Sequence, residues 1–290
     1  MWGFKCVDNE CKKVEIADYN DTTSIDVCRL TCSDDIGTLL PKPSKKIEII
    51  KKTTPINYFN MTYQVVNDHE YWKEAWERFQ KFQSKKLLIP AEKLKLGKDL
   101  IVNITISNES LVLDYSIYEG YSLKVNELND RIAVNINAEN YYGARHALET
   151  LDQLIVFDEF NALIVILQQA DIEDEPRFKH RGISMDTSRN FFPVEDIERT
   201  IEGLAMVKMN IFHWHITDAQ SIPLDLISRP ELTRLGAYSF DKIYTADDIR
   251  RIVRFAKIRG IQVIPEFDTP SHVGEGWQNT GLTLCYKGRI

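Results

Sequence analysis

The chain has 290 residues, 43% of them hydrophobic and 27% charged, which is typical of globular proteins with one or two domains. Its formal net charge of −7 argues against nucleic acid or an anionic membrane as a partner, because both favour clustered Lys and Arg. No window reaches the roughly 18 to 20 consecutive apolar residues of a membrane span, and no apolar signal-peptide segment follows Met1.

The N-terminal residues are rich in cysteine. Cys6, Cys11, Cys28 and Cys32 lie in one short polar stretch, and Cys28 and Cys32 are spaced to lie one turn apart on one helix face. Because that face could contact a single antiparallel neighbour, the spacing favours the nested disulfides Cys6–Cys32 and Cys11–Cys28. A zinc site is the alternative, since both ends of the pattern nearly have the spacing of zinc ligands.

The sequons and the remaining cysteine bear on the compartment. Asn20, Asn60, Asn103 and Asn108 each begin an Asn-X-Ser/Thr sequon and are predicted to carry N-glycans. Together with the predicted disulfides they favour an extracellular or lysosomal protein, although this chain shows no signal peptide. Cys285 is predicted either to pair with a cysteine elsewhere or to be a buried free thiol.

The chain is predicted to have three parts, and the first two precede residue 177. Residues 1–43 form a disulfide-rich segment, and the Pro-containing stretch PKPS marks its end. Residues 44–176 mix alternating strands with two amphipathic helices and are predicted to form an α+β domain. Strands are expected at 45–52, 100–107, 121–127, 131–137 and 161–167, and helices at 70–83 and 140–157.

Residues 177–290 follow a strand, helix, strand, helix, strand pattern. The strands are expected at 182–188, 210–216 and 261–267, with a first helix over about 195–209. After a long loop, Thr245 and Asp248 form a predicted capping box that begins the second helix, which Gly260 ends. This alternation predicts parallel strands in an α/β fold. Phosphate-binding glycines would favour an open doubly wound sheet and are missing here, so we expect the first three strands of an incomplete (β/α)8 TIM barrel.

Polar side chains gather at the carboxyl ends of these three strands, where a barrel has its active site. They are Asp186 and Arg189 for the first strand, His213, His215 and Asp218 for the second, and Glu266, Asp268 and His272 for the third. An arginine here can simply pair with a carboxylate, and an aspartate–histidine pair can be purely structural. Alternatively, the two strand histidines with His272 and Asp218 could hold zinc, as in amidohydrolases.

Three stretches of residues 174–277 resemble the catalytic domain of glycoside hydrolase family 20, the β-N-acetylhexosaminidases. They are DEPRFKHRGISMDTSRNF, KMNIFHWHITD and VIPEFDTPSHVGEGW. The stretch NYYGARHALETLDQL is similar to the α+β domain that precedes this catalytic domain, and the N-terminal cysteines are similar to those of the insect members. The resemblance covers nearly the whole chain.

The resemblance implies roles for individual residues. Arg189 matches the arginine that binds the hydroxyls at C3 and C4 of the terminal sugar, which suits a planar fork of donors. Asp218 and His272 match a pair that supports the catalytic acid. In this family neither His213 nor His215 binds a metal, so no metal or other cofactor is expected. The remaining carboxylates are expected to brace the site by hydrogen bonds.

The family mechanism is substrate-assisted and retaining, and it needs an Asp-Glu pair that this sequence does not supply. Asp158-Glu159 and Asp174-Glu175 precede the predicted barrel and cannot reach its active site. We therefore expect residues 1–290 to be inactive. The parent enzyme, for which a homodimer is one expected state, would release terminal N-acetylhexosamine from chitooligosaccharides or N-glycans. The alternatives are a truncated glycan-binding relative and a zinc-dependent barrel hydrolase.

Overall fold

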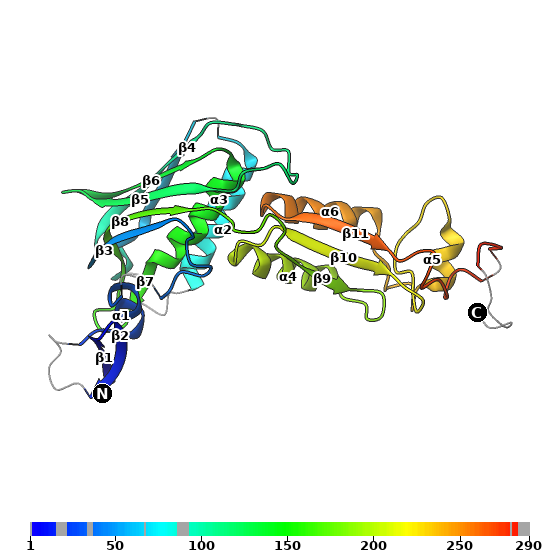
Figure 1. The fold of residues 1–290 in the computed structure, drawn as a ribbon, viewed down its shortest axis with the longest axis horizontal. Coiled ribbons are helices and arrows are strands. Elements are labelled where there is room, and N and C mark those ends of the chain that lie inside the picture. The colour runs from blue at the N-terminus through cyan, green and yellow to red at the C-terminus, as the bar shows by residue number, and fades with distance from the viewer. Residues whose placement is uncertain are drawn as a thin grey trace. The chain divides into compact units, whose positions relative to one another are not determined.

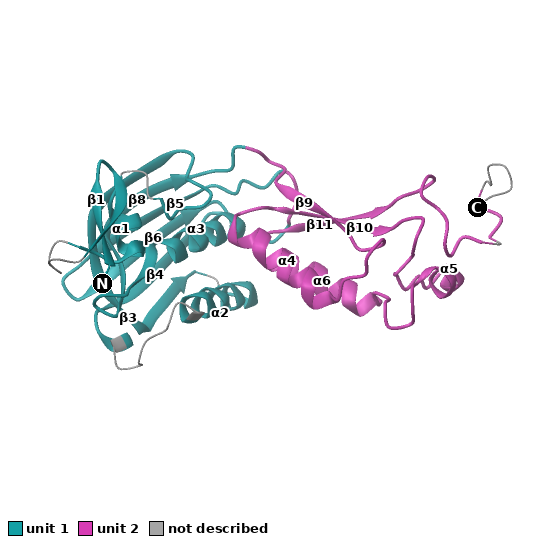
Figure 2. Ribbon diagram, turned by 90° about the horizontal axis from the view of Figure 1, so that it is seen from below, with its two compact units in different colours: residues 1–112, 116–177 teal, residues 113–115, 178–290 magenta. Residues whose placement is uncertain are grey.

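The chain folds into two compact units (Figure 1, Figure 2). The computed structural model describes residues 2–15, 22–33, 37–66, 68–85, 93–278 and 280–283. Unit 1 comprises residues 1–112 and 116–177, and unit 2 comprises residues 113–115 and 178–290. The predicted glycosylation site Asn20 and the remaining cysteine, Cys285, lie outside the described residues. Because unit 1 includes the N-terminal segment as well as the α+β region, the boundary predicted at residue 43 stays a prediction.

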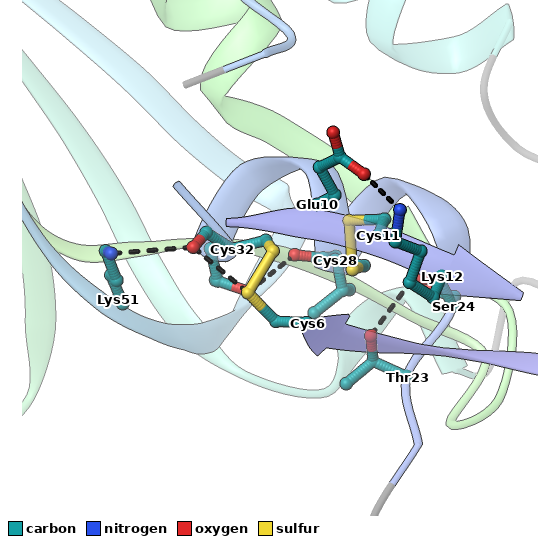
Figure 3. Close-up of a disulfide and its surroundings, with 11 residues drawn as sticks. Cys6, Glu10, Cys11, Lys12, Thr23, Ser24, Cys28, Cys32 and Lys51 are labelled. Carbon is teal, nitrogen blue, oxygen red and sulfur yellow. Dashed lines mark hydrogen bonds and ion pairs between the residues drawn. A yellow bond between two sulfur atoms is a disulfide. The ribbon is translucent and has the colours of Figure 1, made fainter. Parts of the chain in front are cut away.

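The N-terminal segment is a hairpin joined to a short helix. β1 (Trp2–Val7) and β2 (Glu10–Glu15) pair antiparallel, and Cys6 lies opposite Cys11. Disulfides Cys6–Cys32 and Cys11–Cys28 connect this hairpin to α1 (Ile25–Thr31) in the nested arrangement, with Cα–Cα distances of 5.2 and 6.0 Å (Figure 3). A sulfur in a disulfide is no thiolate, so the alternative of a zinc site at these cysteines is wrong.

A six-stranded mixed sheet forms the rest of unit 1, in the order β3-β4-β6-β5-β8-β7. Its strands are β3 (Lys46–Val65), β4 (Lys98–Ile106), β5 (Tyr121–Glu127), β6 (Arg131–Ala138), β7 (Ile155–Asp158) and β8 (Leu163–Asp174). β3 pairs antiparallel with β8 as far as Pro55 and parallel with β4 from Ile56 onward. The strand predicted at 45–52 was therefore too short. The sequence pattern misses the continuation because a proline, here Pro55, normally argues against a continuing strand.

Two helices accompany this sheet, α2 (Glu70–Lys85) and α3 (Tyr141–Leu154), and they contact each other. α3 packs on β4, β5 and β6, whose alternate residues are buried. Its N-cap Asn140 accepts hydrogen bonds from the backbone N–H of Tyr142 and Gly143. The predicted helix over 140–157 was too long, because Ile155 and Val156 leave it to pair with β8.

Unit 2 contains a three-stranded parallel sheet in the order β11-β10-β9. Its strands are β9 (Gly182–Asp186), β10 (Ile211–Thr217) and β11 (Gln262–Phe267), and its helices are α4 (Val194–Met206), α5 (Pro230–Gly236) and α6 (Ala246–Ile258). The predicted parallel alternation and the capping box of Thr245 with Asp248 are confirmed. The connection predicted as a long loop is partly wrong, because it contains α5. Closure into a barrel stays a prediction.

The two faces of β10 have different surroundings, and this separates the core from the polar residues. Phe212, Trp214 and Ile216 belong to the apolar core formed with residues of α4 and α6. The buried indole N–H of Trp214 donates to Thr187 Oγ1 at 2.9 Å. Since side chains alternate along a strand, His213 and His215 lie on the opposite face. Among the described residues no helix has the length and apolar character that a transmembrane span requires.

Two glycine substitutions test the packing of these helices. A Cβ at Gly143 in α3 would lie 2.5 Å from the carbonyl oxygen of Gly120, whereas a Cβ at Gly203 in α4 would meet no atom within 4 Å. We expect Gly143→Ala to lower the free energy of unfolding by about 1–3 kcal/mol through overpacking. Gly203→Ala should raise it by up to about 1 kcal/mol through helix propensity. Urea unfolding measures both, and equal effects of the two substitutions would contradict the close approach at Gly143.

Candidate functional site

Three carboxylate and imidazole side chains lie side by side across the sheet of unit 2. The parallel register pairs His215 on β10 with Asp186 on β9 and with Glu266 on β11. His213, two residues earlier on β10, lies on the same face. Asp186, His215 and Glu266 therefore form a row across the sheet near the carboxyl ends of the three strands. Residues in the loops that follow these strands extend the row.

Asp218, in the loop after β10, is the centre of this site. Its side chain is 1% exposed, and its Oδ2 lies 2.6 Å from Arg189 Nη2 and 2.9 Å from His215 Nε2. His272 Nδ1 lies 3.6 Å from the same oxygen, while Oδ1 accepts the backbone N–H of Ala219 at 2.6 Å. The structure thus brings together Arg189, Asp218 and His272, which follow three different strands.

The charge of Asp218 is stabilised in spite of its burial. Burial by itself raises the pKa of this carboxyl, but hydrogen bonds from His215 and the Ala219 backbone, with the charge of Arg189, hold it below its ordinary value. The pKa of Asp186 is also lowered, because bonds from the Arg189 side chain and backbone outweigh burial. Asp218 and Asp186 are therefore ionised acceptors near neutral pH.

Arg189 is held by three side chains and still faces solvent. Nη1 donates to Asp186 at 2.7 Å, Nε donates to Gln220 at 3.1 Å, and Nη2 pairs with Asp218. A guanidinium has five N–H donors, so two of them are left over by these three contacts. The side chain is 42% exposed. Arg189 is therefore oriented by the protein and can donate to a ligand.

Glu266 and Asp268, the other two carboxylates that the sequence places at this site, contact histidine side chains. Glu266 Oε2 lies 2.5 Å from His213 Nε2 and 3.0 Å from His215 Nδ1, while Asp268 accepts a hydrogen bond from His272 Nδ1. Hydrogen bonding to Asp268 and the charges of Asp268 and Asp218 raise the pKa of His272. The predicted bracing role of Glu266 and Asp268 thus has a geometric basis.

Backbone and serine contacts, which the sequence analysis missed, tie the three loops together. Ser188 Oγ donates to the carbonyl oxygen of Ser221 at 2.8 Å, and Ser221 Oγ donates to that of Ser188 at 2.7 Å. The backbone N–H of Glu275 donates to the carbonyl oxygen of Ala219 at 2.9 Å. No spacing in the sequence indicates these partners, because each bond joins loops far apart along the chain.

A metal is the alternative occupant of this site. Two groups of residues have ligand atoms within 4.8 Å of one another, His215 with Glu266 and Asp268, and Asp218 with Asp268 and His272. However, both ring nitrogens of His215 face carboxylates as hydrogen-bond partners, and a protonated nitrogen has no lone pair for a metal. The Arg189 cation beside Asp218 also opposes a second cation. The donor set therefore fits a metal poorly.

Comparisons with known proteins bear on this site. Residues 178–288 match the family model "Glycosyl hydrolase family 20, catalytic domain", and residues 39–154 match "beta-acetyl hexosaminidase like". The chitooligosaccharidolytic beta-N-acetylglucosaminidase of Bombyx mori is 38% identical over an alignment of 295 positions that covers 99% of this chain and 49% of that protein. The same enzyme of Ostrinia furnacalis is 36% identical over 99% of this chain and 49% of that protein.

A solved structure shares the fold. The chitobiase of Flavobacterium johnsoniae matches with a TM-score of 0.67 and 32% sequence identity, over 81% of this chain and 35% of that chain. The chain spans about half the length of the two insect relatives, 49% of each.

The pKa directions in this site predict a pH window for the stability of unit 2. The lowered pKa values of Asp186, Asp218 and Glu266 stabilise the fold above about pH 4, and this contribution is lost as the pH falls through the folded values. The raised pKa values of His215 and His272 stabilise it below about pH 6.5, and that contribution is lost as the pH rises through the folded values. Stability should therefore be greatest between these limits.

Thermal unfolding of wild type and Asp218→Asn from about pH 3 to about pH 9 measures this window. The variant should show weaker losses on both sides, because Asp218 is itself one of the titrating carboxylates and contacts both titrating histidines, His215 and His272. Asp247→Asn, which changes an exposed carboxylate on α6, is the matched control and should follow wild type. Parallel profiles for wild type and Asp218→Asn would contradict the central place of Asp218.

Proposed function

The chain belongs to glycosyl hydrolase family 20, and on that premise we propose that it contributes the sugar-binding half of the active site of a β-N-acetylhexosaminidase. The proposed reaction is hydrolysis of terminal, non-reducing N-acetyl-β-D-hexosamine from oligosaccharides. The convergence of Arg189, Asp218 and His272 around one carboxylate oxygen is the observation that carries the proposal. Because the chain spans about half of its relatives, the activity is proposed for a protein that also supplies the Asp-Glu pair of the family.

In this proposal Arg189 donates its two remaining N–H groups to the hydroxyls at C3 and C4 of the terminal sugar. Asp186 and Asp218 fix the planar guanidinium, so that little conformational entropy is lost when the sugar binds. Asp218 and His272 then act behind the catalytic acid. A charged His272 favours the ionised form of a neighbouring glutamate after its proton has left.

The proposed mechanism is substrate-assisted. The 2-acetamido oxygen of the sugar attacks C1, the bond from C1 to the leaving oxygen breaks, and the catalytic glutamic acid protonates that oxygen. Water then attacks C1 of the cyclic oxazolinium intermediate and gives its proton to the glutamate, while the bond from C1 to the acetamido oxygen breaks and the product keeps its configuration. The acid and its neighbouring aspartate would come from the Asp-Glu pair, which is not among residues 1–290. We therefore expect this chain by itself to bind sugar weakly and to lack turnover.

We also propose the division of the chain into three parts that the sequence predicts. Residues 177–290 would supply the first three strands of a (β/α)8 barrel, residues 44–176 an α+β domain and residues 1–43 a separate segment. The parallel order β11-β10-β9 with helical crossovers is the arrangement that a barrel requires. A homodimer of the longer protein is proposed with it.

Substrate and compartment are proposed from the relatives and the disulfides. The word "chitooligosaccharidolytic" in the names of both insect relatives favours chitooligosaccharides over N-glycans. Two disulfides favour a secreted or lysosomal location. Asn60 and Asn108 are exposed and Asn103 is half-buried in β4, and all three are proposed to carry glycans.

An activity assay tests the proposed function. Residues 1–290 should release no chromophore from an aryl N-acetyl-β-glucosaminide, whereas the longer protein should turn it over and be inhibited by N-acetylglucosamine thiazoline. Arg189→Lys in the longer protein should lower kcat/KM by about 10- to 100-fold, because hydrogen bonds from a charged fork are lost. Arg250→Lys, an exposed arginine on α6, is the control and should be silent. Turnover by residues 1–290 would overturn the expected inactivity, and an inert longer protein would overturn the proposed reaction.

The metal-dependent alternative has its own test. Purified protein dialysed against zinc and then against buffer should hold well below one zinc per chain, as measured by plasma mass spectrometry. Turnover by the longer protein should survive a chelator, since no step of the proposed mechanism uses a metal. Stoichiometric zinc that Glu266→Gln or His215→Gln removes would favour the metal hydrolase instead.

A further inference from the structure

His215 lies in an unusual position, because both of its ring nitrogens face carboxylates. Nδ1 lies 3.0 Å from Glu266 Oε2, and Nε2 lies 2.9 Å from Asp218 Oδ2. The residue is 9% exposed, so water has little access to either nitrogen. The parallel register of β10 with β11 sets the first contact, and the turn after β10 sets the second.

These contacts decide the protonation state of His215. An ionised carboxylate can only accept hydrogen bonds, so each ring nitrogen must carry a proton for both contacts to be favourable. A neutral imidazole has one N–H and would turn a lone pair toward one of the carboxylates. Although burial lowers the pKa of His215, the bonds to Glu266 and Asp218 outweigh it and raise the value.

We propose that His215 and Glu266 are positioning residues for the active site, in which a charged His215, held by Glu266, fixes Oδ2 of Asp218 between Arg189 and His272. The catalytic consequence rests on the proposed function, whereas the relay from Glu266 through His215 to Asp218 does not. His215 touches neither the sugar nor the reacting atoms in this proposal. It acts on both the sugar-binding arginine and the histidine behind the acid through one shared oxygen.

The carboxylate of Asp218 needs several partners to keep one orientation. Rotation of a carboxylate about χ2 is soft, so a single partner does not hold one oxygen in place. Oδ1 accepts the backbone N–H of Ala219, while Oδ2 pairs with Arg189 Nη2 at 2.6 Å and lies 3.6 Å from His272 Nδ1. His215 Nε2 is the second donor to Oδ2 beside Arg189, and together with the Ala219 backbone these donors leave the carboxylate one orientation.

The charges around His215 come from all three strands. Asp186, Glu266, Asp218 and Asp268 are acidic, and Arg189, His213 and His272 are the other basic groups of the site. Loss of the proton from His215 would leave Asp218 and Glu266 with one donor fewer each. The contact between Asp218 and His272 should then weaken, which links the state of one histidine to that of the other.

Nuclear magnetic resonance of the chain tests the relay without any need for turnover. In ¹⁵N-histidine-labelled residues 1–290, both ring nitrogens of His215 should stay protonated at pH values above the ordinary pKa of about 6.5. Glu266→Gln, which keeps the shape of the side chain, should lower the titration midpoint of His215 by about one unit or more. His180→Gln is the control. It removes an exposed histidine that is hydrogen-bonded to Tyr115, and it should leave the titration midpoints of His215 and His272 unchanged.

The decisive readout is the sign of the change at His272 in His215→Gln. Removal of a positive neighbour alone would raise the titration midpoint of His272. Loss of the contact between His215 and Asp218 would let the Asp218 carboxylate turn away from His272. The titration midpoint of His272 would then fall toward its ordinary value, which is the result we expect. A rise, or a neutral His215 at pH 6 in wild type, would overturn the proposal. If His215→Gln fails to fold, Glu266→Gln decides instead, because an unchanged titration midpoint of His215 in that variant would overturn the proposal.

Kinetics of the longer protein separate this proposal from the proposed function. His215→Gln should lower kcat by about 10-fold or more and move the pH profile of kcat, since the acid loses its fixed partner. Unchanged kcat and pH profile in an active enzyme would overturn the positioning role. If the longer protein has no hexosaminidase activity but the shifts at His215 and His272 are found, the proposed function fails and the relay stands.

Discussion

One buried negative charge organises the site, the carboxylate of Asp218. It is 1% exposed, and a charge so far from water is stable only when donors surround it. Arg189, His215 and the Ala219 backbone supply those donors, and His272 lies next to them. If any of these partners is removed, the carboxylate loses stabilisation that no other described contact replaces. The positions of Arg189 and His272 thus depend on one oxygen of Asp218.

The sheet makes this arrangement possible by dividing the side chains of β10 between two faces. Trp214 anchors the strand in the apolar core, where its indole N–H is satisfied by Thr187. His215, the next residue, is consequently directed to the other face and into register with Asp186 and Glu266. The burial of tryptophan and the presentation of histidine are two results of the same alternation. A slip by one residue would exchange the two faces.

Much of the fold followed from local patterns, and the exceptions have identifiable causes. The parallel strands and capped helix of unit 2 were predicted because apolar periodicity and capping residues act over a few neighbours. The length of β3 was not, because Pro55 reads as an interruption although it lies where the strand exchanges one partner for another. α3 ends at Leu154 because pairing of the following residues with β8 overrides their continuation of the helix.

For the site, the sequence by itself determined which side chains stand at the carboxyl ends of three parallel strands, among them Arg189, Asp218 and His272. Their order along the chain settles this, since each of them follows a predicted strand and a barrel places such residues at the carboxyl ends of its parallel strands. Only the tertiary structure decided that His215 joins Glu266 to Asp218, and that Ser188 and Ser221 tie two loops together. Those contacts depend on the register between strands and on how the helices pack between them. Neither is set by residues that are neighbours in the chain.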